Sequence, residues 1–224
     1  AKDALIVKST VAEYQVGSKV SEKDEITLRA GDVVSVLTRR GTRTMRGPGT
    51  FIVGANPKSN RTRFANLTRK GAALKTRTGG VRSVRQGGKR SRPQSPNLYY
   101  LDVEREGPVC LRDLSEVFVW RPYNANTSTY ALTEAASEGT NQTLSLSIVF
   151  PETQSTSKNV SQRFAMQDGR DYTISNVQNG TVTAITVIDL GSDIRRADAL
   201  AEVLYQKGCI AQFELLAEQL AGGS

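Results

Sequence analysis

The sequence predicts a mainly β protein, with a small N-terminal β meander, a β-sandwich-like domain and a C-terminal helical hairpin. Three observations predict this fold class. Short apolar runs alternate with glycine-rich turns through most of the chain, which is typical of antiparallel strands. Asn179-Gly180 is a strong hairpin signal between two such runs. After residue 191 the apolar residues follow the helical period instead.

Residues 1–54 are expected to form a small antiparallel β domain. Its apolar, β-prone runs end at turns such as Ala30-Gly31-Asp32, Arg40-Gly41 and Gly47-Pro48-Gly49. The expected strands are Ala4–Lys8, Ile26–Arg29, Val33–Leu37, Thr42–Arg46 and Thr50–Val53.

Residues 55–97 break this rhythm and are expected to form an extended basic insert. The insert has 12 Lys and Arg residues, no Asp or Glu, five glycines and a single aromatic residue, Phe64. Such a composition buries too little apolar surface to offset its chain entropy. An irregular segment of this length is either functional or disordered.

Residues 98–190 return to the strand pattern and predict a β-sandwich-like domain. Asn179-Gly180 is expected to join the last two strands through a type I′ turn. The expected strands are Leu98–Val103, Glu116–Trp120, Thr129–Leu132, Thr143–Phe150, Asp171–Val177 and Thr181–Asp189.

Residues 191–224 predict two helices joined at Gly208. Ser192 is the expected N-cap of the first helix, and Gly208 is the expected stop between the two. The expected apolar faces comprise Ile194, Ala197, Leu200 and Leu204 in the first helix, and Phe213, Leu216 and Leu220 in the second.

The charge is unevenly distributed along the chain. Residues 33–101 hold 16 of the 30 basic residues and no acidic residue, which leaves 14 basic against 22 acidic residues elsewhere. The chain is therefore an acidic body with a strongly basic insert, and this asymmetry favours a partner of opposite charge.

The sequence offers no assembled catalytic or metal-binding machinery, and we expect neither an enzyme nor a cofactor. It has no histidine, the commonest general base and metal ligand. Ser155 and Lys158 match a Ser-x-x-Lys pattern, but they stand in a polar loop without its companion motifs. Asp102 and Glu104 alternate on one predicted strand, which is typical of a solvent-facing edge.

Two cysteines, Cys110 and Cys209, are compatible with a single disulfide in an oxidising compartment or with two buried thiols. The sequence starts at Ala1 instead of a methionine, so we expect either a shortened chain or a mature product after signal cleavage. No run approaches the roughly 18 apolar residues that a membrane-spanning helix needs.

The basic insert is the strongest functional signal. We expect it to bind an acidic protein surface, such as the external face of a membrane protein or another copy of the chain. Anionic polymers are the alternative: lipopolysaccharide, acidic polysaccharide or extracellular DNA. Nucleic acid is less expected, because residues 65–98 lack the aromatic side chains on which bases stack. The candidate binding residues are Arg69, Lys70, Lys75, Arg77, Arg82, Arg85, Lys89, Arg90 and Arg92.

Six motifs follow one another along the whole chain: Thr42–Phe51, Thr76–Ser83, Pro96–Val103, Val109–Leu111, Val119–Pro122 and Gly208–Gln212. Together they resemble a group of uncharacterised exported proteins of alphaproteobacteria. The N-terminal part is also similar to the FecR-like β-domain of periplasmic signalling and assembly proteins. The resemblance implies a periplasmic or cell-surface location and a Cys110–Cys209 disulfide, and it brings no catalytic residues.

Overall fold

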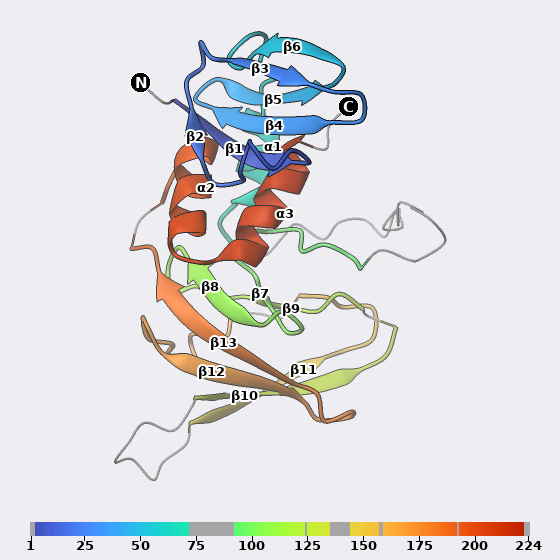
Figure 1. The fold of residues 1–224 in the computed structure, drawn as a ribbon. Helices are drawn as coiled ribbons and strands as arrows, with labels where there is room; N and C mark the ends of the chain where they lie inside the picture. The colour runs from blue at the N-terminus through green and yellow to red at the C-terminus, as the bar shows by residue number, and fades with distance from the viewer. Residues whose placement is uncertain are drawn as a thin grey trace. The chain divides into compact units, whose positions relative to one another are not determined.

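The computed structural model describes residues 3–71, 92–123, 125–134, 144–156, 159–191 and 193–221. The chain divides into two compact units (Figure 1). Unit 1 joins residues 1–67 with 193–224, and unit 2 comprises residues 68–192. The mainly β fold class and the C-terminal pair of helices are confirmed. The sequence predicted residues 191–224 as a helical hairpin separate from the N-terminal β domain, whereas the two helices pack with the N-terminal strands in unit 1.

Unit 1 is built around an antiparallel sheet with the strand order β2-β1-β4-β5. A second antiparallel pair, β3 with β6, packs on it. The order departs from a simple meander at β3, which pairs with β6 instead of β4. The bounds of the strands are Ala4–Ser9 (β1), Lys19–Val20 (β2), Glu25–Leu28 (β3), Val33–Thr38 (β4), Gly41–Arg46 (β5) and Gly49–Ile52 (β6).

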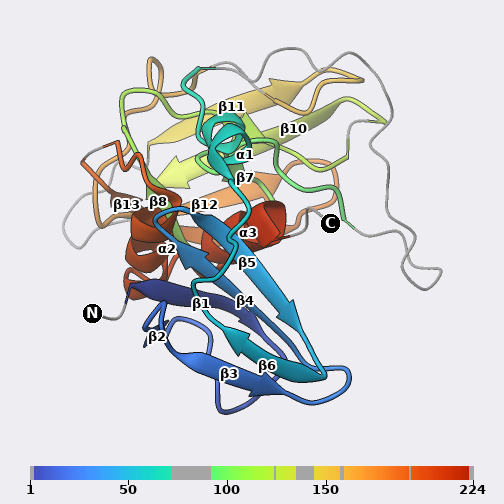
Figure 2. The same cartoon turned by 90° about the horizontal axis from the view of Figure 1, so that it is seen from above.

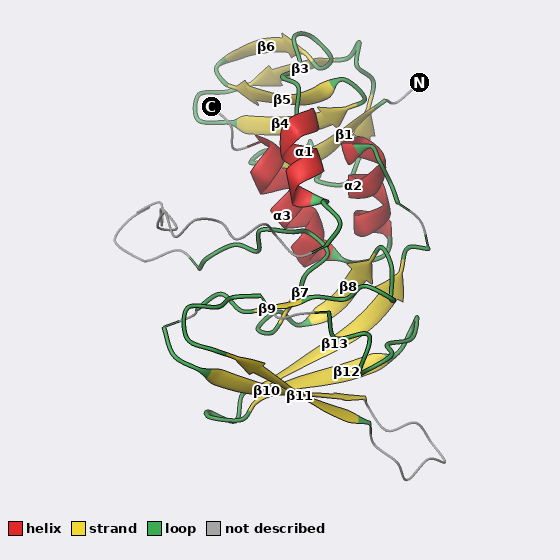
Figure 3. Ribbon diagram, turned by 180° about the vertical axis from the view of Figure 1, so that it is seen from behind, coloured by secondary structure: helices red, strands yellow, loops and turns green. Residues whose placement is uncertain are grey.

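Both faces of the sheet in unit 1 are covered, which explains why β1 and β4 are continuous apolar runs instead of alternating ones. One face contributes Ile6, Val34 and Val36 to a core shared with β3. Helices α2 (Ala197–Gln206) and α3 (Ile210–Ala221) pack against the sheet, as Figure 3 shows. Their buried side chains include all the predicted face residues except Ile194, which precedes α2 and is half-buried.

The turn between α2 and α3 closes as a Schellman motif. Gly208 has φ +75°, its N–H donates to the carbonyl of Tyr205, and the N–H of Cys209 donates to that of Leu204. Gly208 therefore ends α2 as predicted. Helix α2 begins after Arg196, which forms no side-chain cap; the predicted cap, Ser192, lies outside the described residues.

Helix α1 (Arg61–Leu67) lies where the sequence predicted an irregular insert. Asn60 accepts from the N–H of Phe64 through its carbonyl and donates to Thr42 through its amide. Phe64 and Leu67, three residues apart, are buried on one face of the helix. Two apolar residues at helical spacing were too short a signal to predict this element.

Unit 2 contains a five-stranded sheet with the order β11-β10-β12-β13-β8. Its pairs are antiparallel except β13 with β8, which is parallel. A parallel pair, β7 with β9, contributes to the core on one face of this sheet. The bounds are Leu101–Asp102 (β7), Gly107–Leu111 (β8), Val119–Trp120 (β9), Ser128–Glu134 (β10), Ser145–Phe150 (β11), Asp171–Asn176 (β12) and Val182–Asp189 (β13).

The β12–β13 hairpin is confirmed, but its turn is not type I′. A type I′ turn needs a positive φ at both central residues, and only Gly180 has one, at +72°. The N–H of Gly180 donates to the carbonyl of Asn176, while the N–H of Asn176 donates to that of Thr181. These two bonds show that the loop is longer than the two residues expected. The side-chain carbonyl of Asn176 also accepts from the N–H of Gln178 inside the loop.

Candidate functional site: the neck of the basic segment

The structure describes three of the nine predicted binding residues: Arg69, Lys70 and Arg92. The other six, Lys75, Arg77, Arg82, Arg85, Lys89 and Arg90, lie outside the described residues. They all belong to residues 72–91, the basic segment, which holds no Asp or Glu. What the structure shows is how unit 2 binds the two ends of this segment.

The chain entering the basic segment is held by three side chains of unit 2, each of which donates to a backbone carbonyl. The amide of Asn97 donates to Arg69 at 2.9 Å, and the hydroxyl of Tyr100 donates to Gly71 at 3.2 Å. The guanidinium of Arg112 donates to Thr68 at 2.7 Å. Because Asn97 and Tyr100 lie on the chain that leaves the segment, its two ends are adjacent. We call residues 68–71 and 92–100 the neck.

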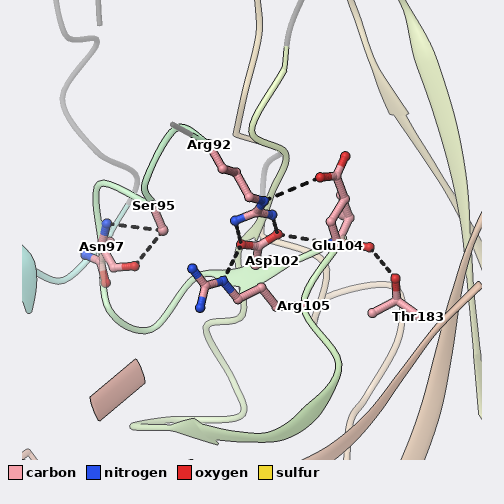
Figure 4. Close-up of polar contacts among 8 residues, drawn as sticks. Arg92, Ser95, Asn97, Asp102, Glu104, Arg105 and Thr183 are labelled. Atoms are coloured by element: carbon pink, nitrogen blue, oxygen red, sulfur yellow. Dashed lines mark hydrogen bonds and ion pairs between the residues drawn. The ribbon is translucent and has the colours of Figure 1, made fainter. Parts of the chain in front are cut away.

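On the returning side of the neck, Ser95 and residues 97–100 are buried. Ser95 and Asn97 are 8% and 3% exposed, and both side chains form hydrogen bonds with the local backbone. The hydroxyl of Ser95 donates to the carbonyl of Asn97, while the side-chain oxygen of Asn97 accepts from the N–H of Tyr99 (Figure 4 shows the first contact). The bond between Asn97 and Tyr99 closes an Asx turn, which fixes the direction of the chain before β7.

Aromatic rings stabilise the same region. The guanidinium of Arg112 lies 5.0 Å from the ring centroid of Tyr99, a cation–π distance. The ring of Tyr100 packs against Phe118 with centroids 5.7 Å apart. The neck is therefore anchored by packed side chains, and its hydrogen bonds are additional to that packing.

Arg92 closes the neck through a two-bond fork to Asp102 (Figure 4). The nitrogens Nη1 and Nη2 lie 2.8 and 2.5 Å from the two carboxylate oxygens. Nε of Arg92 lies 3.5 Å from Glu104, and the guanidinium lies 5.6 Å from the ring of Trp120. Asp102 is positioned by β7, which pairs with β9 in register Asp102 to Trp120. Planar, bidentate pairing of this kind is specific to arginine.

Arg92 is thus a structural cation. Burial acts to lower the pKa of Arg92, but the hydrogen bonds and charges of Asp102, and then of Glu104, hold that pKa above its ordinary value. The side chain of Asp102 is only 11% exposed, although the sequence predicted a solvent-facing carboxylate. The prediction was wrong for Asp102, because this carboxylate binds Arg92, whereas Glu104 is 41% exposed as expected.

Both cysteines are disulfide-bonded, and neither is free. Cys110 lies in β8 and Cys209 caps α3, where its carbonyl accepts from the N–H of Phe213. Both side chains are completely buried. A buried disulfide is consistent with an oxidising compartment.

The described ranges contain no cluster of residues that could hold a metal ion. Ser155 is bound through its backbone, since its carbonyl accepts from the N–H of Arg121, and Lys158 lies outside the described residues. Among the helices that the structure describes, none has the length and apolar content needed to cross a membrane.

Comparisons with known proteins add no assignment: no family model, no curated protein and no solved structure matches the chain. The geometry of the neck is therefore the main structural guide to function.

Proposed function

We propose that this chain is a non-catalytic interaction protein of the periplasm or cell surface, which uses its basic segment to bind an acidic protein surface. The neck is the observation that carries this proposal. A linker leads from one place to another, whereas the basic segment leaves and re-enters unit 2 at adjacent points. A segment that is held in this way is better suited to presenting its own side chains.

The charge distribution supports an external partner. Six Lys and Arg residues of the basic segment have no acidic residue within the segment. Two carboxylates that follow the neck in the chain, Asp102 and Glu104, already bind Arg92. Single exposed ion pairs contribute only about 0–1 kcal/mol each, so binding must be collective.

Binding of an anionic polymer is the second candidate. The same six charges would suit phosphates or acidic sugars. The segment has no aromatic residue on which nucleobases could stack, which disfavours single-stranded nucleic acid. A disulfide and the resemblance to exported proteins support the proposed location for both candidates.

The test replaces the six basic residues of the segment with Gln and measures capture of partners from an envelope extract. A matched control removes six exposed positive charges from elsewhere, so that net charge falls equally. The control residues are Lys8, Lys23, Lys58, Arg61, Arg163 and Lys207. We expect the segment variant to lose its captured protein and the control to retain it.

Salt dependence then distinguishes the two candidates. Binding to purified lipopolysaccharide or acidic polysaccharide through counterion release should fall steeply between ~50 and ~200 mM salt. A packed protein interface should depend on salt less. If the segment variant binds every partner as well as the unmodified chain at both salt concentrations, the basic segment has no binding role.

A further inference from the structure

Strand β11 is the outermost strand of the five-stranded sheet (Figure 2). The N–H of Glu134 donates to the carbonyl of Leu144, which fixes the hydrogen-bonding phase with β10. Hydrogen-bonded pairs alternate in an antiparallel ladder. Leu146, Ile148 and Phe150 therefore bond to β10, and the N–H and C=O groups of the alternate residues point away from the sheet. These alternate residues are Ser145, Ser147 and Val149.

This open edge lacks the features that normally protect an edge strand. Proteins blunt such edges with charges, prolines, bulges or short strands. The six residues of β11 include no charge and no proline, and the register with β10 has no bulge. The opposite edge strand, β8, contains Pro108. No described residue forms a backbone hydrogen bond with the outer side of β11.

The exposed face beside this edge is also uncharged. Ser147 pairs with Ala131, which pairs with Ser175, which pairs with Val182, so one row of small neutral side chains crosses four strands. The exposed Ser145, Ser147 and Val149 continue this face to the edge. On the other face Leu146, Ile148 and Phe150 are buried. A strand that pairs here must therefore alternate neutral and apolar residues.

We propose that β11 pairs antiparallel with β11 of a second copy of this chain, around a two-fold axis at Ser147. In this register Ser147 faces Ser147, and Ser145 faces Val149 of the second copy. All three outward residues then exchange both backbone hydrogen bonds across the axis. A register shift by two residues in one direction leaves Val149 without a bonded partner inside the strand. A shift by two in the other direction places Ser145 opposite Pro151, which has no N–H.

The side chains favour a second copy over an unrelated peptide. The strand has the required alternation, and pairing with itself brings no like charges together. Leu144 is 58% exposed and has the same parity as the buried residues of β11. The proposed register places Leu144 opposite Phe150 of the second copy, beside an apolar row. The two sheets would become one continuous sheet, with both buried faces on the same side.

The test uses charges at Ser147, where the two copies are closest. Sedimentation velocity of the full chain over a wide concentration range should show a monomer–dimer equilibrium. Ser147→Lys and Ser147→Glu should each abolish the dimer, because like charges would face each other across the axis. Mixing the two variants should restore a heterodimer. Ala184→Lys is the control, because it adds the same charge to the same face but on β13, away from the edge.

Amide hydrogen exchange gives a second readout. The N–H groups of Ser145, Ser147 and Val149 should exchange more slowly at high than at low protein concentration. A monomer at every concentration up to millimolar overturns the proposal, as does a dimer that Ser147→Lys leaves unchanged. Retention of the dimer in the six-Gln variant of the basic segment is expected, since this edge acts independently of that segment.

Discussion

The guanidinium of Arg92 and the carboxylate of Asp102 join two parts of the chain that the sequence had treated separately. Arg92 follows the basic segment directly, and Asp102 lies in β7, the first strand of unit 2. Their fork uses both carboxylate oxygens, and Arg105 approaches one of them at 3.8 Å. The ion pair between Arg92 and Asp102 is therefore satisfied within the molecule and is unavailable to a partner.

Asp102→Asn should destabilise unit 2 by about 1–3 kcal/mol, because it leaves the partly buried Arg92 without a full counter-charge. Glu104→Gln is the matched control. Glu104 is 41% exposed and meets Arg92 at 3.5 Å, so its loss should cost less than about 1 kcal/mol. Urea unfolding at neutral pH measures both effects, and equal losses would contradict the assigned role of the fork.

Arg121 is a buried cation held by neutral groups. It is 2% exposed and donates to the carbonyls of Gln154, Asn126 and Pro151 and to the hydroxyl of Ser128. Burial lowers the pKa of Arg121 below its ordinary value. The guanidinium of Arg121 therefore connects the chain segments on either side of β10 and β11.

Arg121→Lys should therefore cost about 2–4 kcal/mol, since a single ammonium cannot replace four directed donors. Arg163→Lys, at an exposed position, should change the stability little. Thermal unfolding of the two variants side by side is sufficient. A stable Arg121→Lys protein would mean that the carbonyls find other donors.

Alanine substitutions at Gly17 and Gly31 distinguish the cost of a steric clash from the cost of backbone strain. Their φ values are +86° and +89°, so alanine should cost each about 1–2 kcal/mol from strain. A Cβ at Gly17 would also lie 2.2 Å from the ring of Tyr205, whereas none of the described atoms comes within 4 Å at Gly31. Gly17→Ala should therefore cost more, and it should shift the ring NMR signals of Tyr205. Equal destabilisation with unchanged ring signals would contradict the packing of Gly17 on α2.

Tyr172 should make the protein lose stability at alkaline pH. Burial raises the pKa of its phenol above the ordinary 10.0, which the bond from the N–H of Gln167 only partly offsets. Below that pH the phenol is protonated in both states and adds no pH dependence. Above it the unfolded chain ionises first, so unfolding is favoured.

Unfolding measured at about pH 9 and about pH 11 should show a smaller loss for Tyr172→Phe than for the unmodified chain. Tyr123→Phe serves as the control, because Tyr123 is 59% exposed and its removal should leave the pH dependence unchanged. Identical alkaline profiles for the unmodified chain and Tyr172→Phe would show that the phenol ionises without unfolding.

Reduction of the disulfide should lower stability by up to about 4–5 kcal/mol, because the bond closes a loop of roughly 100 residues. An alkylating reagent should label neither Cys110 nor Cys209 before denaturing reduction and both afterwards. The Cys110→Ser, Cys209→Ser double variant should unfold at the urea concentration of the reduced protein and should not respond to reductant. Two labelled thiols in the native protein would contradict the bond.

Local signals in the sequence determined most of the secondary structure. The alternation in β10 to β13 and the spacing in α2 and α3 can be predicted because each depends on neighbours within a few residues. The sequence missed β2 and α1, which are too short to show a period, and β8, whose Gly107-Pro108 start resembles a turn. It also predicted the location of the excess positive charge, since composition needs no structure.

By itself, then, the sequence determined the mainly β class, the helical pair, the lack of histidine chemistry and the existence of a basic segment. Only the tertiary structure decided that α2 and α3 belong with the N-terminal strands and that Asp102 is held by Arg92. It alone decided that the two ends of the basic segment are adjacent and that β11 is an edge. Each of these depends on contacts between residues far apart in the chain, and no periodicity or composition records which distant residues meet.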